Sequence, residues 1–480
     1  MTAEEELDPE IMDIFESDRI FKDHEKIARL RAVIAAFFDK SKDRRDAKRL
    51  LSKLIEIVHE HPDLKSEFAE KDALKKPGLR LLQLSIPFSI NSGVVTVTRN
   101  ISKAFTQSGA NVAIVNHWWH RYSYGKDPDK HYVKMSPYSL LRGDGNLLEL
   151  RWAFKHILKD MKEKYKYHPQ ICHVHTHTFY EDKSIQLFHD YFPGVPIIFT
   201  LHAFIPYIKL NTDQRERLLG DRMPKEEIMQ IRNRAYAGRE KSQEGMIKIA
   251  DRIITISQAH KDAFDRFYPE LKDKCVCIPN GTDFELYSEL KGVIEKSAAL
   301  RSKIAPSGER IMIYVGRIEP QKGARALVNG FNHVAAKYPD VKLVLIGPDK
   351  SKESVLLELG LDKRFLSRIS YEGWVKDREL LAAYYRLADV MVQPVFSKDL
   401  YGMAVLEAMI MKVPVISCPG VLTVGNCGSP EEIVRAVDHI FTNKEAVSRH
   451  VSNVRERVMA DFSLSSIYKK HMELYSSLLR

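Results

Sequence analysis

Short apolar segments of strand character alternate with helical stretches from residue 79 to the end of the chain. Such segments lie at 79–85, 111–115, 196–200 and 311–315. This alternation argues for parallel sheets covered by helices, because a parallel crossover has to pass over a face of the sheet. A chain of 480 residues with 44% apolar side chains can build two such cores. The expected fold class is therefore α/β, with doubly wound domains.

The segment 399–417 places two carboxylates, Asp399 and Glu407, eight residues apart. Between them Gly402 opens a short helix, which breaks at Pro414 before an apolar strand. A helix N-terminus attracts phosphate through its backbone N–H groups, and carboxylates accept hydrogen bonds from hydroxyls. The segment thus has what a site needs to hold a sugar attached to a nucleoside diphosphate.

A second segment, earlier in the chain, supplies positive charge. The strand at 311–315 runs into Gly316 and Arg317, and Lys322 and Gly323 open the next helix. A planar guanidinium and a mobile ammonium both suit a diphosphate leaving group. No acidic metal cluster lies nearby in the sequence, so we expect these cations to neutralise the diphosphate without a metal or cofactor. For either segment alone, the alternative is a solvated surface loop.

Together the two segments resemble the donor domain of the retaining glycosyltransferases of GT-B fold, family 4 type, also called glycosyltransferase group 1. Further likenesses follow in the family's order at 250–257, 278–283, 343–347 and 373–393. The resemblance implies two Rossmann-like domains that face a cleft: an acceptor domain at 78–290 and a nucleotide-sugar donor domain at 291–460. It also implies a terminal helix at 461–480 that crosses back to the first domain. The packing residues of that helix would be Tyr468, Met472, Leu474 and Leu478.

The resemblance also implies roles for single residues. Those that contact the donor sugar or stabilise its diphosphate, and so count as catalytic, would be His175, Asp399, Arg317 and Lys322. The donor-binding set would be Gly93, His202, Arg317, Lys322, Val375, Asp399, Gly402, Met403 and Glu407. Within this set, Glu407 would accept from the ribose diol and the main chain of Val375 would hold the base. The implied reaction is hexosyl transfer with retention, by same-face attack assisted by the leaving phosphate, and uridine diphosphate is the leaving group expected on frequency.

The histidines and tryptophans of the first half bear on the acceptor side. His173, His175 and His177 alternate at the end of a strand, which raises metal binding as an alternative to the family's "H-x-H". No Asp, Glu or Cys completes a metal site within that segment, so the expected metal ligands are none. The aromatic loop with Trp118 and Trp119 should lie at the carboxyl end of a strand, where it could bind the acceptor or seal the edge of the sheet.

Two departures from the family pattern leave other functions open. Asp399 stands where Glu is usual, and the loop after Gly420 is shortened. Either the donor differs or the activity is weaker. The alternatives are a catalytically weak nucleotide-sugar-binding subunit of a glycosyltransferase complex, and a disaccharide synthase or phosphorylase on the same fold. The acceptor, whether saccharide, lipid-linked or small molecule, is not identified by these residues.

Residues 1–77 are charge-dense and carry apolar residues at helical spacing, which predicts a helical extension. It would pack on the first domain or on a second copy of the protein; a membrane-surface helix is the alternative. The net charge of +10 leaves peripheral membrane contact open, whereas no basic stripe interleaved with aromatics suggests nucleic acid. Five cysteines without a CxxC pair, an acidic N-terminus and no apolar run of ~18 residues favour a cytoplasmic protein.

Overall fold

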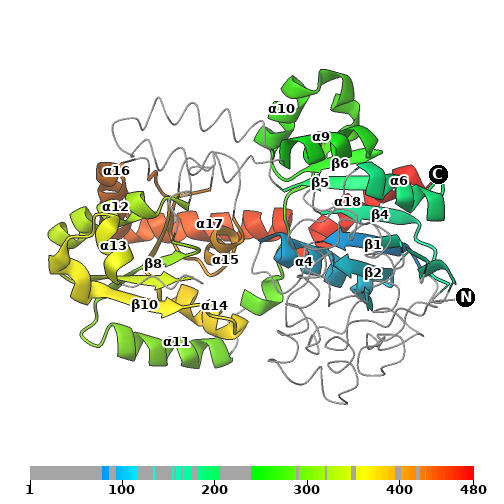
Figure 1. Ribbon diagram of the computed structural model, residues 1–480. Coiled ribbons are helices and arrows are strands. Elements are labelled where there is room, and N and C mark those ends of the chain that lie inside the picture. The colour runs from blue at the N-terminus through cyan, green and yellow to red at the C-terminus, as the bar shows by residue number, and fades with distance from the viewer. Residues whose placement is uncertain are drawn as a thin grey trace, which may run out of the picture. The chain divides into compact units, whose positions relative to one another are not determined.

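The computed structural model describes residues 78–85, 93–116, 133–135, 154–155, 158–159, 161–163, 166–175, 182–202, 204, 239–287, 291–318, 322–347, 353–394, 402–417, 422–427 and 429–479. The predicted extension at 1–77 lies outside these residues, as do Trp118, Trp119, His177 and Asp399. The described residues fall into two compact units (Figure 1). The first contains those up to Thr200 with Lys241–Ile253, and the second contains most of the remainder from Ile254 to Leu478.

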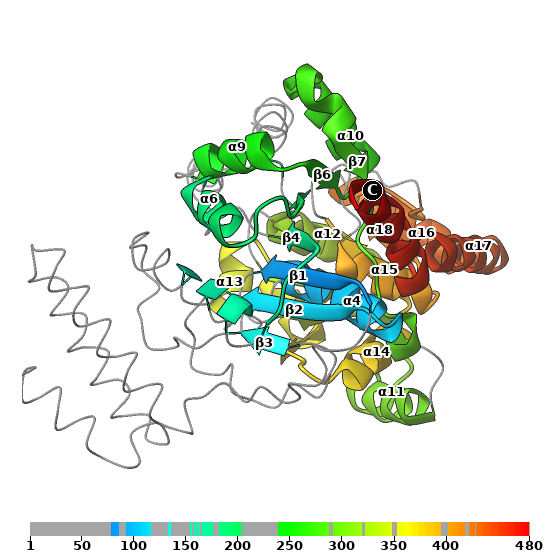
Figure 2. The ribbon, with the colours of Figure 1, turned by 90° about the vertical axis from the view of Figure 1, so that its right-hand side faces the viewer.

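One sheet has seven strands in the order β3-β2-β1-β4-β5-β6-β7. Its strands are β1 Arg80–Ser85, β2 Asn111–Asn116, β3 Val133–Met135, β4 Ile171–Val174, β5 Ile197–Leu201, β6 Arg252–Thr255 and β7 Cys275–Cys277. The pairings of β1 with β2 and β4, of β2 with β3 and of β4 with β5 are parallel, and Figure 2 shows β1, β2 and β3 side by side. The helices of this part of the chain include α4 Gly93–Gln107, α6 Asp182–Tyr191, α9 Arg239–Ile249 and α10 Gln258–Phe267.

A second sheet has five strands in the order β10-β9-β8-β11-β12, and its neighbours pair in parallel. Its strands are β8 Arg310–Val315, β9 Val341–Ile346, β10 Ile369–Gly373, β11 Val390–Gln393 and β12 Val415–Ser417. Its helices are α11 Lys291–Ile304, α12 Ala324–Lys337, α13 Glu353–Glu358, α14 Arg378–Leu387, α15 Met403–Ile410, α16 Pro430–Thr442 and α17 Lys444–Phe462. The two parallel sheets with interleaved helices confirm the predicted fold class.

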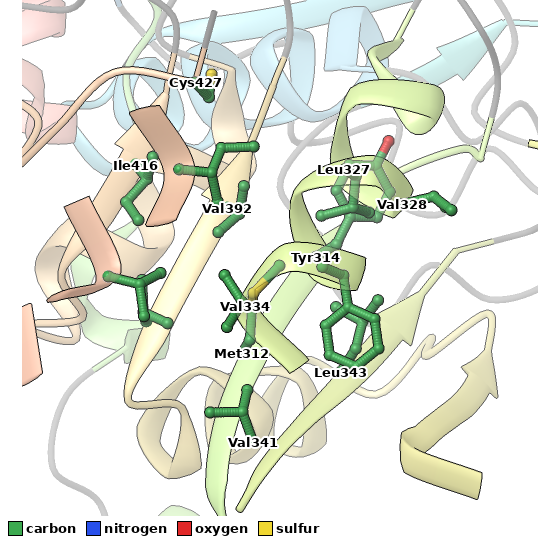
Figure 3. Packing of buried hydrophobic residues seen from close by; sticks show 14 of the residues in the cluster. Met312, Tyr314, Leu327, Val328, Val334, Val341, Leu343, Val392, Ile416 and Cys427 are labelled. Atoms are coloured by element: carbon green, nitrogen blue, oxygen red, sulfur yellow. The ribbon is translucent and has the colours of Figure 1, made fainter. Parts of the chain in front are cut away.

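Strand β8 shows why helices cover this sheet on both faces. Met312 and Tyr314 belong to one buried cluster, with α12 and α16 (Figure 3), and Ile311 and Ile313 belong to another, with α11, α14 and α15. Side chains alternate between the faces of a strand, so four consecutive buried residues need apolar cover on both sides. Figure 1 shows α11 and α14 on one side of the sheet and α12 and α16 on the other.

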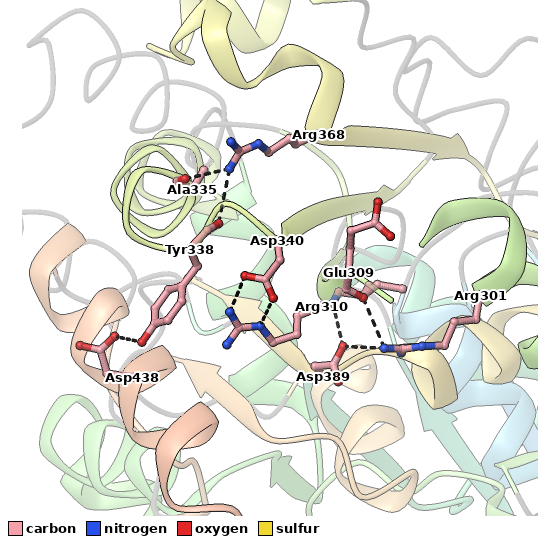
Figure 4. Close-up of polar contacts among 10 residues, drawn as sticks. Arg301, Glu309, Arg310, Ala335, Tyr338, Asp340, Arg368, Asp389 and Asp438 are labelled. Carbon is pink, nitrogen blue, oxygen red and sulfur yellow. Dashed lines mark hydrogen bonds and ion pairs between the residues drawn. The ribbon is translucent and has the colours of Figure 1, made fainter. Parts of the chain in front are cut away.

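The amino ends of β8, β9 and β11 carry a network of charged side chains (Figure 4). Arg310 forms an ion pair with Asp340, and its guanidinium lies 4.0 Å from the ring centroid of Phe441. Asp389 accepts a 2.7 Å hydrogen bond from the backbone N–H of Ile311. These contacts hold the strands in register where they enter the sheet.

The C-terminal segment forms α18 Leu464–Leu478, after a break from α17 at Ser463. Ser463 caps the new helix by accepting from the backbone N–H of Ser466 at 3.2 Å. The buried face of α18 consists of Ile467, His471, Leu474 and Tyr475. Of the predicted packing residues, only Leu474 belongs to this face; Tyr468, Met472 and Leu478 are half-buried. The prediction thus identified Leu474 and did not name Ile467, His471 or Tyr475.

Among the described residues, no helix is both long and apolar enough to cross a membrane.

Candidate functional site

The second sheet has a topological switch point between β8 and β11. The chain leaves β8 for β9 and β10 on one side, then returns to place β11 and β12 on the other. Ligands of open α/β sheets bind outside the carboxyl ends of the strands at such a point. Helices α12 and α15 follow β8 and β11 and therefore begin at this edge, where their N-terminal N–H groups favour an anion.

Two glycines allow the backbone at this edge to pack closely. A Cβ at Gly347 would lie 2.1 Å from the carbonyl oxygen of Gly316. A Cβ at Gly323, whose φ is +76°, would lie 1.9 Å from the carbonyl oxygen of Pro394. The segment after β8 is thus pressed against the ends of β9 and β11, and only glycine fits at both contacts.

The backbone of the two predicted cations is fixed by these contacts. The hydroxyl of Tyr314 donates a 2.7 Å hydrogen bond to the carbonyl of Arg317, whose side chain is exposed. Ile318 is buried beside it, and half-buried Lys322 precedes Gly323, the N-cap of α12. The structure therefore places both cations at the switch point of the second sheet.

Glu407 lies on the second turn of α15 and is only 7% exposed. The hydroxyl of Tyr385, on α14, donates a 2.9 Å hydrogen bond to its Oε2. Burial raises the pKa of Glu407, while Tyr287, Arg378 and Tyr385 act in the opposite direction. A buried carboxylate with polar donors around it is suited to accept hydrogen bonds from a ligand.

The remaining predicted positions of the second sheet frame this edge. Gly402 is the N-cap of α15 and is exposed, and a Cβ there would meet nothing within 4 Å. Met403, the first residue of α15, is half-buried. Val375 follows β10 and packs against the same core as α14 and α15, next to Trp374, which is 43% exposed. Among the described residues, none therefore fills the space beside Gly402.

The first sheet has its own switch point, between β1 and β4. Gly93 opens α4 after β1, and His175 follows β4 directly. His202 follows β5, one strand further. His175 is 2% exposed, and its ring centroid lies 4.1 Å from that of His173. The Nε2 of His173 is 2.6 Å from the hydroxyl oxygen of Thr200.

The alternative that His173 and His175 bind a metal ion finds no support among the described residues. Within the described ranges, no three His, Cys, Asp or Glu side chains are grouped to hold a metal ion. His173 instead faces the hydroxyl of Thr200, so an ordinary hydrogen bond accounts for its polar contact.

The structure thus gathers Arg317, Lys322, Val375, Gly402, Met403 and Glu407 around one sheet edge, whereas Gly93, His175 and His202 follow strands of the other sheet. Sequence reasoning missed Tyr287 and Tyr385, which lie beside Glu407. The paired tyrosines at 384–385, within the run of family likeness, were the available signal.

Comparisons with known proteins agree with this geometry. The family model "Glycosyl transferases group 1" matches residues 309–453, and the model "Glycosyltransferase Family 4" matches residues 91–286. The D-inositol 3-phosphate glycosyltransferase of Mycobacteroides abscessus is 25% identical over 248 residues, 51% of this chain and 50% of that protein. This chain spans about half of the length of the curated relatives that it matches.

Solved structures share the fold over most of the chain. Sucrose-phosphate synthase from Thermosynechococcus elongatus superposes with a TM-score of 0.62 and 20% identity, covering 83% of this chain and 99% of that one. Anabaena Alr3699/HepE, in complex with UDP and glucose, superposes with a TM-score of 0.60 and 16% identity, covering 83% and 100%. With both family models matched in order, this chain belongs to the group 1, family 4 type glycosyltransferases of GT-B fold.

Proposed function

We propose that this chain transfers a hexosyl group from a nucleoside-diphosphate sugar to a hydroxyl acceptor, with retention of anomeric configuration. The observation that carries this proposal is the switch point of the second sheet. There, backbone fixed by Gly323 and Gly347 presents Arg317 and Lys322 beside the N-termini of two helices. Uridine diphosphate is the proposed leaving group, in keeping with the UDP bound by Alr3699/HepE.

In the proposed reaction, the bond between the anomeric carbon and the diphosphate oxygen breaks, and a bond from the acceptor oxygen forms on the same face. The acceptor's proton passes to the leaving phosphate oxygen. Negative charge grows on the diphosphate as the bond breaks. Hydrogen-bond donors and cations that bind the diphosphate more strongly in the transition state than in the ground state therefore lower the barrier. Arg317 and Lys322 have this role, without a metal ion.

The remaining roles are those that the family resemblance implies. Glu407 accepts from the ribose hydroxyls, and the start of α15 at Gly402 and Met403 holds phosphate or sugar through its backbone. Val375 holds the base by its main chain. Asp399 and His175 contact the donor sugar, Gly93 and His202 complete the donor contacts, and Trp118 and Trp119 bind the acceptor.

The test is slow hydrolysis of the donor in the absence of acceptor, followed by NMR during the first turnovers. Incubation with UDP-glucose, ADP-glucose and GDP-mannose, each with and without EDTA, should release one nucleoside diphosphate and the α-configured sugar at equal rates in both conditions. Release of the β-configured sugar would contradict retention, and loss of the reaction in EDTA would contradict the metal-free role of the two cations. Binding of a nucleotide sugar without any turnover would instead favour a catalytically weak nucleotide-sugar-binding subunit.

A further inference from the structure

The carboxylate of Glu407 accepts from one buried tyrosine, Tyr385, and the ring of a second buried tyrosine, Tyr287, lies near that of the first. Tyr385 comes from α14, is fully buried and donates to Oε2 at 2.9 Å. Tyr287 comes from the 3-10 turn Phe284–Tyr287, is 2% exposed, and its ring centroid lies 6.3 Å from that of Tyr385. A glutamate that bound ribose from the surface would need neither tyrosine, so this enclosure calls for an explanation.

Enclosure has opposite effects on the two protonation states of Glu407. Removal from water favours the neutral acid, whereas a hydroxyl that donates to a carboxylate oxygen favours the ion. The ion offers both oxygens as acceptors, whereas a protonated carboxyl has one donor and a reduced acceptor capacity.

Several charged groups lie on the elements that surround Glu407. Arg378, also on α14, lowers the pKa of Glu407. Asp283 precedes the turn that carries Tyr287, and its charge raises the pKa of that tyrosine. From α17, Arg455 bonds to the carbonyl of Ile410, at the far end of α15. Strand β12 contributes only Val, Ile and Ser.

Tyr287 sits on backbone that is itself anchored. The N–H of Thr282 donates to the carbonyl of Phe462 at 2.9 Å, and a Cβ at Gly281 would lie 2.5 Å from Cγ1 of Ile467. The turn that follows therefore holds the ring of Tyr287 in a fixed position near that of Tyr385, which supports the orientation of Tyr385.

We propose that Tyr385 is a positioning residue, which keeps Glu407 ionised and orients its carboxylate to accept from the ribose hydroxyls of the donor. This inference rests on the proposed function, because it concerns the same nucleotide site. It goes further in assigning the ionisation of that carboxylate to the hydroxyl of Tyr385, which acts through Glu407 and need not touch the donor.

The test is the pH dependence of nucleotide affinity in Tyr385→Phe. Calorimetric titration with UDP, ADP and GDP, from about pH 8 to about pH 5, should show the wild-type protein losing affinity for its nucleotide as Glu407 takes up a proton. Tyr385→Phe lacks the hydroxyl that donates to Glu407 and lowers its pKa, so this loss should begin at higher pH. At the alkaline end Tyr385→Phe should bind about tenfold more weakly, as expected for a hydrogen bond to a charged group.

The matched control is Tyr384→Phe. Tyr384 is the neighbouring residue on α14, is 4% exposed, and donates its hydroxyl to Glu372 at 2.5 Å instead. This variant removes the same atom from the same helix, so it should lower the melting temperature comparably and leave the pH of half-maximal affinity unchanged. A 2′,3′-dideoxy nucleotide lacks both ribose hydroxyls and should bind wild type and Tyr385→Phe equally.

The outcomes separate the two proposals. A wild-type protein that binds none of the three nucleotides at any pH would overturn the proposed function and this inference with it. A wild-type protein that binds, with Tyr385→Phe showing the same pH dependence as wild type or as Tyr384→Phe, would overturn only the role of Tyr385.

Discussion

The two edges of the five-stranded sheet use polar side chains in different ways. At the amino ends of the strands, Arg310 pairs with Asp340 and Asp389 accepts from the backbone of β8 (Figure 4). At the carboxyl ends, glycine contacts fix the backbone of Arg317, and Glu407 meets a tyrosine hydroxyl. Charge at the first edge joins strand to strand, whereas charge at the second edge is assigned to a ligand by the proposed function. Substitutions at the two edges should therefore separate stability from activity.

The largest effect is expected at the carboxyl edge. Arg317→Ala and Lys322→Ala should each lower kcat/KM for the donor by about 10²-fold or more, because each removes charge stabilisation of the departing diphosphate. Both should melt within a degree or so of wild type, since neither side chain is part of the core. Steady-state kinetics and calorimetry check this, and unchanged turnover in either variant would remove that residue from the diphosphate site.

Gly323→Ala should lower both stability and activity, because it strains the backbone that presents Lys322. The new Cβ would collide with the carbonyl of Pro394 at a φ of +76°, and we expect a loss of about 2–3 kcal/mol of unfolding free energy. Gly308→Ala is the control, with a φ of +83° and nothing within 4 Å of the added Cβ. It should cost about 1 kcal/mol and leave activity intact. Equal losses in the two variants, from denaturant unfolding, would show that the close approach contributes nothing.

Asp389→Ala should lower stability without affecting activity, the reverse of what is expected for Arg317→Ala. It leaves the backbone N–H of Ile311 without its 2.7 Å acceptor and removes the ion pair with Arg301, so stability should fall by about 1–2 kcal/mol. The KM for the donor should stay unchanged. A raised KM with an unaltered melting temperature would mean that the amino edge also serves the ligand.

The smallest effect concerns pH. The hydrogen bond from Arg310 lowers the pKa of Asp340 below its ordinary value, so the pair contributes stability above the unfolded-state pKa of about 4 and loses it as pH falls through the folded-state value. Asp340 is half exposed, which limits the contribution to less than about 1 kcal/mol. Asp340→Asn should therefore flatten the acid side of the stability profile below about pH 4. A profile that stays parallel to that of wild type would assign the acid loss to other carboxylates.

Local sequence predicted the elements of the second sheet closely. The apolar run at 311–315 gave β8, now Arg310–Val315, and Gly402 marked the start of α15. Each of these signals lies within a few residues of the element that it specifies. Strands β3 and β7 were not among the predicted segments, and on α18 the prediction named Leu474 but not Ile467, His471 or Tyr475.

The surroundings of Glu407 could not be predicted in the same way. Its motif indicated a hydroxyl-binding carboxylate, but Tyr385 lies 22 residues away in sequence and meets it only through the packing of α14 on α15. Tyr287 is more distant still and arrives on a separate turn. Long-range contacts of this kind depend on tertiary packing, which spacing along one element does not encode.

The most direct test of the diphosphate site compares a nucleoside diphosphate with its monophosphate by calorimetric titration, in wild type and in Arg317→Ala. If the switch point of the second sheet holds the diphosphate, wild type should bind the diphosphate at least about tenfold more tightly, and Arg317→Ala should lose most of that difference. Equal affinity for the two nucleotides in wild type would contradict the assignment of Arg317 and Lys322 to the leaving group.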